Sequence, residues 1–377
     1  LTHNLDIDFD AIKDEMAEEY LDDAQAYPWI VTFSGGKDST LVAHLVFEIL
    51  LSLPPSLRRR SVYFVSNDTL VESPLVANHM RTTLDAILTA AKRYKLPIDG
   101  QVTTPKLDET FWTLLIGKGY PSPNRNMRWC TDRLKISPTS NYILDKVSAH
   151  GAAIILLGVR KDESSARRTS IENHKNKENS NLTPHGTLKN ALVYRPIMGV
   201  STDDVWEFLV YNDPPWGGSH RDLVTLYKEA AGGECPIILS ADEAPGCGTN
   251  SSRFGCWTCT VVQKDKSLQG FVDVGKTEFI PLLEFRDWLV EIRNDPAYRQ
   301  VKRRNGNITI KNGKHIPGPF TINARKMILD KLLKVQAEFD GELISSDEIK
   351  LIYQIWANDL LDDVKRSNPP IKEPYDS

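Results

Sequence analysis

Residues 34–40, with the sequence Ser-Gly-Gly-Lys-Asp-Ser-Thr, constrain the fold of this 377-residue chain more than any other segment. They follow the apolar run 29–33 and precede an apolar stripe at helical spacing over 41–50. A strand, a tight turn and a helix N-terminus therefore meet here. The two glycines let the backbone approach an anion closely, and the unpaired N–H groups of the helix point at it. The segment predicts a phosphate-binding loop, completed by the lysine and the hydroxyls.

The order of residues differs from the Walker pattern, in which two widely spaced glycines precede Lys-Ser/Thr, so we do not expect a kinase-like grip on the β and γ phosphates. The segment resembles the SGGxDS loop of the PP-loop ATP pyrophosphatases. That resemblance implies cleavage of ATP between the α and β phosphates, a loop that holds the departing pyrophosphate, and attack on an AMP-activated intermediate by a sulfur or nitrogen nucleophile. The predicted nucleotide-binding residues of the loop are Ser34, Gly35, Gly36, Lys37, Asp38, Ser39 and Thr40.

The hydrophobic pattern around the loop alternates strands with helices. It predicts apolar strands at 61–65 and 153–157, an extended segment at 101–104 and a long helix at about 74–95. This βαβα order predicts an α/β fold, a parallel sheet with helices on both faces, whose ligand crevice lies beyond the carboxyl ends of the strands. We therefore expect the strand ends to open onto the crevice that holds the SGGKDST loop.

Two segments at the predicted strand ends resemble the phosphoadenylyl-sulfate reductase branch of the same family. Residues 67–74 are similar to its DTG…fpE stretch, with a leucine in place of the glycine, and residues 158–168 are similar to its GxRxxES…R element. The resemblance places Asp68, Gly158 and Arg160 beside the nucleotide. A carboxylate such as Asp68 accepts from a ribose hydroxyl or holds Mg²⁺, and otherwise simply stabilises a turn. The guanidinium of Arg160 is suited to bidentate phosphate recognition.

Five cysteines are present, and four of them lie between residues 232 and 259. Without a secretory signal, metal ligation or reactive thiols are expected rather than disulfides. Cys256 and Cys259 form a Cys-Trp-Thr-Cys knuckle that places two thiolates on one ion, and four thiolates suit either tetrahedral zinc or an iron–sulfur cluster. A purely structural zinc site is therefore one alternative.

Residues 128–135, Arg-Trp-Cys-Thr-Asp-Arg-Leu-Lys, resemble the CCxxRKxxP segment of cluster-bearing adenylyl-sulfate reductases, with one cysteine in place of the pair. This resemblance favours a metal site formed by Cys130, Cys247, Cys256 and Cys259, with Cys235 as an alternative ligand or as the sulfur carrier. In the competing arrangement the ligands are Cys235, Cys247, Cys256 and Cys259. Cys130, beside arginines that would stabilise its thiolate, then carries the sulfur.

Together with residues 252–262, these segments resemble the DndC family, the sulfurtransferase-like component of DNA phosphorothioation systems, over about residues 25–290. The resemblance implies an enzyme that uses ATP, Mg²⁺ and a 4Fe–4S cluster to replace a non-bridging oxygen of a DNA phosphate by sulfur, with Lys37, Asp38 and Arg160 as catalytic residues. It also implies DNA, a cysteine desulfurase and other Dnd-type or Ssp-type proteins as partners.

Other activities remain as alternatives. A phosphoadenylyl- or adenylyl-sulfate reductase needs a mobile C-terminal catalytic cysteine, and no cysteine follows Cys259. A tRNA thiolation enzyme would differ in the nucleic acid that stimulates its turnover. A nucleotide-binding scaffold would bind ATP without releasing pyrophosphate.

Composition and charge limit the class of protein, its cellular compartment and its mode of binding nucleic acid. The chain is 41% hydrophobic and 25% charged, which is typical of a soluble globular protein. It lacks an apolar run of the ~20 residues that a membrane span needs, so we expect a cytoplasmic protein with no membrane contact. The net charge of −4 argues against a globally basic nucleic-acid coat but leaves local patches such as 302–304. We expect a PP-loop domain over 1–232, a cysteine-rich cluster-binding segment over 233–270, and a mostly helical region over 271–377 with a basic loop or hairpin at 302–314.

Overall fold

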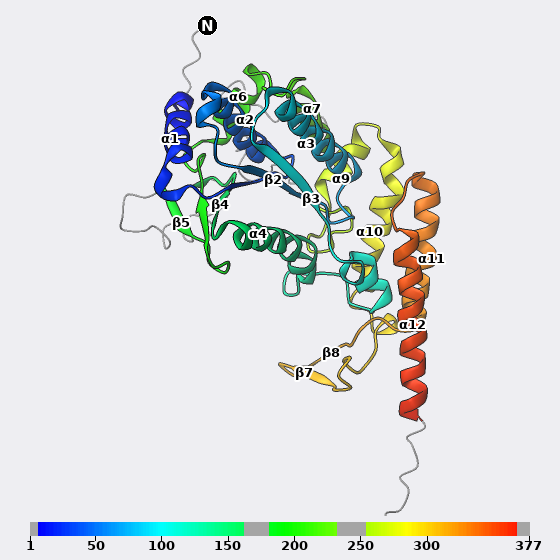
Figure 1. Cartoon of the computed structure of the whole chain (residues 1–377). Helices are drawn as coiled ribbons and strands as arrows, with labels where there is room; N and C mark the ends of the chain where they lie inside the picture. The colour runs from blue at the N-terminus through cyan, green and yellow to red at the C-terminus, as the bar shows by residue number, and fades with distance from the viewer. Residues whose placement is uncertain (1–6, 162–180, 232–253, 368–377) are drawn as a thin grey trace, which may run out of the picture.

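The structure, a computed structural model, describes residues 7–161, 181–231 and 254–367. Its centre is a six-stranded sheet with the strand order β3-β2-β1-β4-β6-β5 (Figure 1). The strands are β1 (Trp29–Thr32), β2 (Val62–Asn67), β3 (Ile98–Thr103), β4 (Ala153–Leu156), β5 (Leu182–Pro184) and β6 (Ala191–Tyr194). Strands β1, β2, β3, β4 and β6 pair in parallel with their neighbours, and β5 pairs antiparallel to β6. The predicted parallel sheet is confirmed, with one short antiparallel strand added at its edge.

The strand order reverses at β1. The chain runs outward from β1 through β2 to β3 and then returns to place β4 on the other side of β1. Thr32 pairs with Val65 of β2, and Val31 pairs with Leu156 of β4. The carboxyl ends of these three strands therefore lie at one edge of the sheet, where ligands of open α/β sheets bind.

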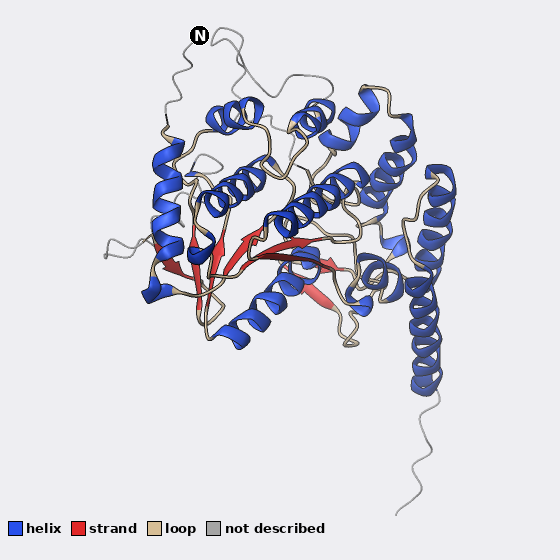
Figure 2. Cartoon of the chain, turned by 45° about the horizontal axis from the view of Figure 1, so that its top comes forward, coloured by secondary structure: helices blue, strands red, loops and turns tan. Residues whose placement is uncertain are grey.

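Helices cover both faces of this sheet, as predicted (Figure 2). Val31 belongs to a large core built with α1 (Phe9–Leu21), α2 (Lys37–Ser52), α3 (Pro74–Tyr94), α6 (Thr202–Tyr211) and α7 (Arg221–Ala230). Its neighbour Ile30 faces the opposite side and packs against Tyr142 and Ile143 of α4 (Ser137–His150). Because successive residues of a strand point to opposite faces, the uninterrupted apolar run of β1 fills both cores.

The C-terminal region is mostly helical, as predicted. It contains α9 (Lys266–Asp273), α10 (Ile280–Ile292), α11 (Ile322–Phe339), α12 (Ser346–Ser367) and a two-stranded hairpin of β7 (Thr309–Lys311) and β8 (Lys314–Ile316). These helices share one core with residues of the preceding segments, including Phe111, Trp112 and Trp257. The indole N–H of Trp112 donates to the carbonyl of Leu343, 2.6 Å away. The helical region is thus packed onto the α/β part through a common apolar core.

Two short π-helical turns, Thr113–Gly117 and Thr131–Ile136, lie between β3 and α4. Single 3-10 turns occur at 23–25, 55–57, 107–109, 277–279 and 296–298. None of the helices in the described ranges combines the length and the apolarity needed to cross a bilayer.

Candidate active site

The SGGKDST loop joins the end of β1 to the first turn of α2. Gly35 has a φ of +73°, and a Cβ built there would lie 2.9 Å from the Cβ of Met80 in α3. Both the left-handed backbone and the close helix therefore require glycine. Gly36 is the N-cap of α2 and has no side chain with which to cap it. The positive end of the α2 dipole is thus directed into the crevice at the strand ends.

The two serines of the loop hold it in shape. The Ser34 N–H donates to the Ser39 Oγ at 3.2 Å, and the two hydroxyl oxygens lie 3.1 Å apart. The Ser39 hydroxyl in turn donates to the Gly36 carbonyl at 2.9 Å. These contacts close the turn upon itself and fix the direction of its N–H groups before any ligand binds.

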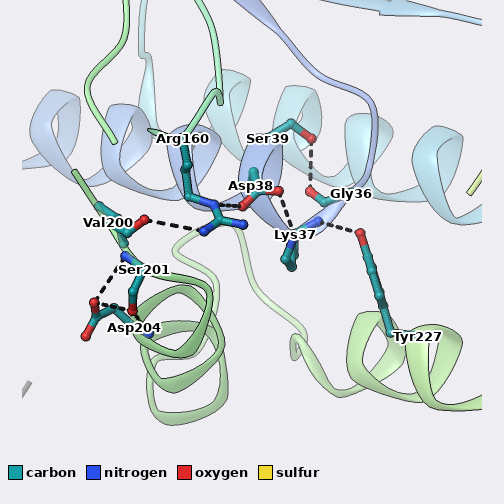
Figure 3. Close-up of polar contacts among 9 residues, drawn as sticks. All are labelled: Gly36, Lys37, Asp38, Ser39, Arg160, Val200, Ser201, Asp204 and Tyr227. Atoms are coloured by element: carbon teal, nitrogen blue, oxygen red, sulfur yellow. Dashed lines mark hydrogen bonds and ion pairs between the residues drawn. The ribbon is translucent and has the colours of Figure 1, made fainter. Parts of the chain in front are cut away.

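Three charged side chains meet at the start of α2 (Figure 3). Asp38 accepts from Arg160 Nε through Oδ1 at 2.6 Å and from Lys37 Nζ through Oδ2 at 2.8 Å. Arg160 is 2% exposed, and its second donor NH1 lies 3.4 Å from the Val200 carbonyl. The structure therefore brings together the three residues that we predicted to be catalytic, with two cations at one helix N-terminus.

Gly158 explains how Arg160 reaches this position. A Cβ at Gly158 would lie 2.9 Å from both the carbonyl carbon and the carbonyl oxygen of Asp38. Only glycine lets the segment after β4 pass this close to the first turn of α2. Its contact is with the loop backbone, and its predicted place beside the nucleotide stays a prediction.

Tyr227 of α7 is a site residue that the sequence did not reveal. Its Oη accepts a 3.3 Å hydrogen bond from the Lys37 N–H, at the point where an anion would bind the helix N-terminus. Its ring lies edge-on to Phe254, with centroids 4.4 Å apart. Burial raises the pKa of the Tyr227 phenol, so it stays neutral. No motif marks this tyrosine, because a single residue on an amphipathic helix carries no local signal.

Asp68 is held by protein groups at the end of β2. It is 5% exposed, its Oδ1 accepts from the Leu70 N–H at 2.7 Å, and its Oδ2 pairs with Arg81 of α3. The first bond supports the left-handed backbone of Leu70, which has a φ of +64°. The carboxylate therefore stabilises the turn, and its contact with ribose or Mg²⁺ stays a prediction.

The turn after β2 also meets the cysteine knuckle. Glu72 forms an isolated antiparallel bridge with Cys256, and the Trp257 N–H donates to the Val71 carbonyl at 3.0 Å. The Cys256 thiol lies 3.7 Å from Glu72 Oε1 and 3.4 Å from the Thr69 hydroxyl. Burial, followed by the nearby charge of Glu72, raises the pKa of this thiol.

Lys135 from the RWCTDRLK segment completes this group. Its Nζ lies 3.0 Å from Glu72 Oε1. Burial favours the neutral amine, but the Glu72 carboxylate, together with Cys256 whenever its thiol is ionised, outweighs it and raises the pKa of Lys135. A cation is therefore kept beside the knuckle, and the sequence segments 67–74 and 128–135 meet at the same place.

Cys130, like Cys256 of the knuckle and Phe254, is partly buried and packs against the apolar core that contains Trp112 and Trp257. Burial and the proximity of Cys259 raise the pKa of its thiol. Within the described ranges, no three His, Cys, Asp or Glu side chains are arranged so that they could hold a metal ion. Cys235 and Cys247 lie outside the described residues, as do 162–168 of the GxRxxES…R element. The predicted four-cysteine site therefore stays a prediction.

Comparisons with known proteins were made by sequence and by structure. An uncharacterized protein of Methanocaldococcus jannaschii is 26% identical over 189 residues, which are 50% of this chain and 32% of that protein. The chain thus spans about a third of that relative's length.

Two solved structures illustrate the structural neighbours. Phosphoadenylyl-sulfate reductase from Candida auris, in a phosphate complex, is 13% identical with a TM-score of 0.32, covering 56% of this chain and 89% of its own. The U34-tRNA thiolase NcsA from Methanococcus maripaludis, with its 4Fe–4S cluster, is 13% identical with a TM-score of 0.33, and the match covers 75% of this chain and 80% of the thiolase chain.

A match to a family model, rather than these distant neighbours, shows the family of this chain. The model described as the phosphoadenosine phosphosulfate reductase domain matches residues 28–262, from the start of β1 to just beyond the cysteine knuckle. This match covers more than half of the 377 residues. It includes the SGGKDST loop, Arg160 and every cysteine. The chain therefore belongs to the phosphoadenosine phosphosulfate reductase domain family.

Proposed function

We propose that this protein is an ATP pyrophosphatase with a sulfurtransferase role, which adenylylates a DNA backbone phosphate for sulfur incorporation, as implied by its resemblance to the DndC family. One observation carries the proposal. Tyr227 contacts the phosphate loop through Lys37 and, through Phe254, the part of the cysteine-rich segment that leads to Cys256. A nucleotide held by the loop would therefore lie close to thiols, as activation followed by sulfur transfer requires.

The residues of the loop supply the means to stabilise pyrophosphate. The N–H groups at the start of α2 face the departing anion, and Lys37 and Arg160 add two cations. Asp38 holds both cations in place before the nucleotide arrives. Phosphate oxygens then compete with this carboxylate for the same donors, so that charge on the phosphates is stabilised as pyrophosphate leaves.

The proposed reaction has two displacements. A non-bridging oxygen of the DNA phosphate attacks the α phosphorus of ATP, and the bond from that phosphorus to pyrophosphate breaks. A sulfur nucleophile, delivered as a persulfide by a cysteine desulfurase, then attacks the DNA phosphorus, and AMP leaves with the oxygen. Activation is needed because an unmodified phosphodiester oxygen is a poor leaving group. A thiol reductant completes the release of sulfur from its carrier.

The cysteines are proposed to hold a 4Fe–4S cluster through Cys130, Cys256, Cys259 and Cys247, with Cys235 as the alternative ligand or sulfur carrier. Thiolates are the donors that such a cluster or zinc prefers. Burial disfavours the bare thiolates of Cys130 and Cys256, so a bound cation would stabilise them. The cluster would supply sulfur or redox chemistry to the adjacent crevice, and zinc would supply structure alone.

Metal analysis tests the cysteine part of this proposal. Anaerobically purified protein should contain about four iron and four acid-labile sulfide per chain, and Cys256→Ser should lose both. Separate Cys235→Ser and Cys247→Ser variants then identify the fourth ligand by which one loses iron. Zinc without sulfide would make the knuckle structural and would overturn the cluster.

Pyrophosphate release from ATP tests the activity. We expect release to be stimulated by DNA in the presence of a cysteine desulfurase and other Dnd-type or Ssp-type proteins. Stimulation by tRNA instead would favour the tRNA thiolation alternative. Turnover of adenosine phosphosulfate with a thiol reductant and no pyrophosphate release would favour the reductase, and ATP binding without release would leave a scaffold.

A further inference from the structure

The segment from Pro296 to Leu329, outside the matched family domain, carries an unusual charge. It contains eight lysines and arginines and neither aspartate nor glutamate, in a chain whose net charge is −4. Its middle part, residues 300–319, forms a projection that we call the basic arm. Figure 1 shows this arm, with β7 and β8 at its end, extending from the C-terminal helices and lying below α4 in that view.

The base of the arm is firmly anchored. The buried Arg299 donates from Nε to the Gly318 carbonyl at 2.7 Å and packs over the ring of Phe320, 5.4 Å from its centroid. Phe320 in turn bonds to the backbone of Gly119 at 2.7 Å. A Cβ at Gly318 would lie 1.8 Å from the Lys302 carbonyl, so the two edges of the arm are in direct contact. The arm is therefore presented in a defined direction.

The arm carries uncompensated positive charge at its end and near its base. Lys311 lies directly opposite Lys314 across the left-handed Asn312-Gly313 turn, and Lys302 is exposed near the base, beside Gly318. No described carboxylate lies within ion-pair distance of these three lysines, whereas Arg304 at the base pairs with Asp359. Like charges directly opposite one another destabilise a hairpin. An anionic partner would relieve this repulsion.

The other face of the hairpin is apolar and equally exposed. Ile310 is 68% exposed and pairs with His315, and Ile308 is 56% exposed. An isolated two-stranded hairpin gains little stability in water, and large apolar side chains at its end are costly. The combination of cations on one face and apolar side chains on the other fits a partner with phosphates and apolar edges side by side.

We propose that the basic arm binds duplex DNA, with Lys302, Lys311 and Lys314 on phosphates and Ile310 against groove edges. A two-stranded ribbon fits the major groove of B-form DNA, where thymine methyl groups offer apolar contacts. The major groove of A-form RNA is too narrow to admit it. The choice of DNA deepens the proposed function and rests on it, whereas the binding of a polyanion by the arm rests on the charges alone.

The test measures binding of a fluorescently labelled mixed-sequence DNA duplex by anisotropy at several salt concentrations, with the whole protein and without ATP. Lys302→Gln, Lys311→Gln and Lys314→Gln are combined in one variant. We expect affinity to fall about tenfold or more at low salt, and the dependence of log K on log salt to lose about 0.9 per phosphate contact removed. A variant that combines Lys302→Arg, Lys311→Arg and Lys314→Arg should retain both the affinity for DNA and its dependence on salt.

A matched control removes the same charge elsewhere, by Lys92→Gln, Arg93→Gln and Lys189→Gln at exposed positions. It should bind DNA like the parent protein. Equal weakening by control and arm variants, or no weakening by the arm variant, would overturn the proposal. Equal binding of an RNA duplex would overturn the assignment to DNA. ATP binding in the absence of nucleic acid, measured by calorimetric titration, reports separately on the phosphate loop and should be unchanged by the arm variant.

Discussion

Arg160 donates a 2.6 Å hydrogen bond from Nε to Oδ1 of Asp38, across 122 residues of sequence, and so joins the end of β4 to the first turn of α2. The guanidinium is almost fully buried, whereas the carboxylate also accepts from Lys37. Two strands that meet at the reversal of the sheet thus contribute opposite charges to one site. This pairing makes the loop and the segment after β4 a single unit.

We expect Arg160→Gln to reduce pyrophosphate release from ATP by about 100-fold or more, because the proposed function assigns this buried donor to the charge that develops on the phosphates. Arg160→Lys keeps the charge but not the planar fork, so it should retain stability better than activity. Steady-state kinetics and thermal unfolding of both variants check this. Unchanged turnover in Arg160→Gln would exclude this arginine from the chemistry.

Gly158→Ala should disrupt the loop without changing any polar group. Its new Cβ would lie 2.9 Å from the Asp38 carbonyl, which is backbone and must shift. We expect about 1–3 kcal/mol of destabilisation and weaker ATP binding. Gly199→Ala is the matched control, since a Cβ there meets no atom within 4 Å. Chemical denaturation and ATP titration of the two variants should differ clearly, and similar behaviour would contradict the close approach.

A buried histidine pair behind the loop predicts sensitivity to acid. His44 Nδ1 lies 3.0 Å from His220 Nε2, and burial, followed by the neighbouring His44 and His79, lowers the pKa of His220 to about 3. In the unfolded chain the imidazole of His220 has a pKa near 6.5 and binds a proton below that pH, whereas in the folded chain it stays neutral until a much lower pH. Stability is therefore complete above about pH 6.5 and is lost as the pH falls toward 3, at up to about 1.4 kcal/mol per pH unit.

Denaturant unfolding at pH 7.5 and 5 measures this effect. His220→Gln should lose less stability on acidification than the parent protein, whereas His315→Gln, on the exposed arm, should lose as much as the parent. An identical loss in all three proteins would show that other groups dominate the acid response.

The fold was largely predictable because its signals are local. The apolar run before Ser34 and the helical stripe at 41–50 each determine their own element, and Ser201 likewise begins α6 locally through a capping box with Asp204. The short strands β5 and β6 were missed, because three or four residues leave no periodic pattern. Hydrophobic periodicity thus gave the sheet but not its edge.

The site was only partly predictable, for a physical reason. Asp38 and Arg160 could be chosen singly, since each lies in a motif, but their pairing depends on how strands return to the sheet. Glu72, Lys135 and Cys256 come from three segments and meet only in the folded chain. Their grouping depends on tertiary packing, which no spacing along the sequence records.

Tyr227 offers the sharpest test of how the loop is used. Its hydroxyl takes the Lys37 N–H that a phosphate oxygen would take, and a Cβ at Gly36 would lie 3.3 Å from the same oxygen. Because one N–H cannot be directed fully at two acceptors, Tyr227→Phe should release it and tighten ATP binding by about two- to tenfold, the equivalent of one net hydrogen bond. The ring and its packing on Phe254 are kept, so stability should hardly change. Calorimetric titration with ATP measures the affinity of the parent protein and of Tyr227→Phe. Weaker binding would instead make the hydroxyl a phosphate donor, and Tyr353→Phe, at an exposed position of α12, controls for the loss of a hydroxyl as such.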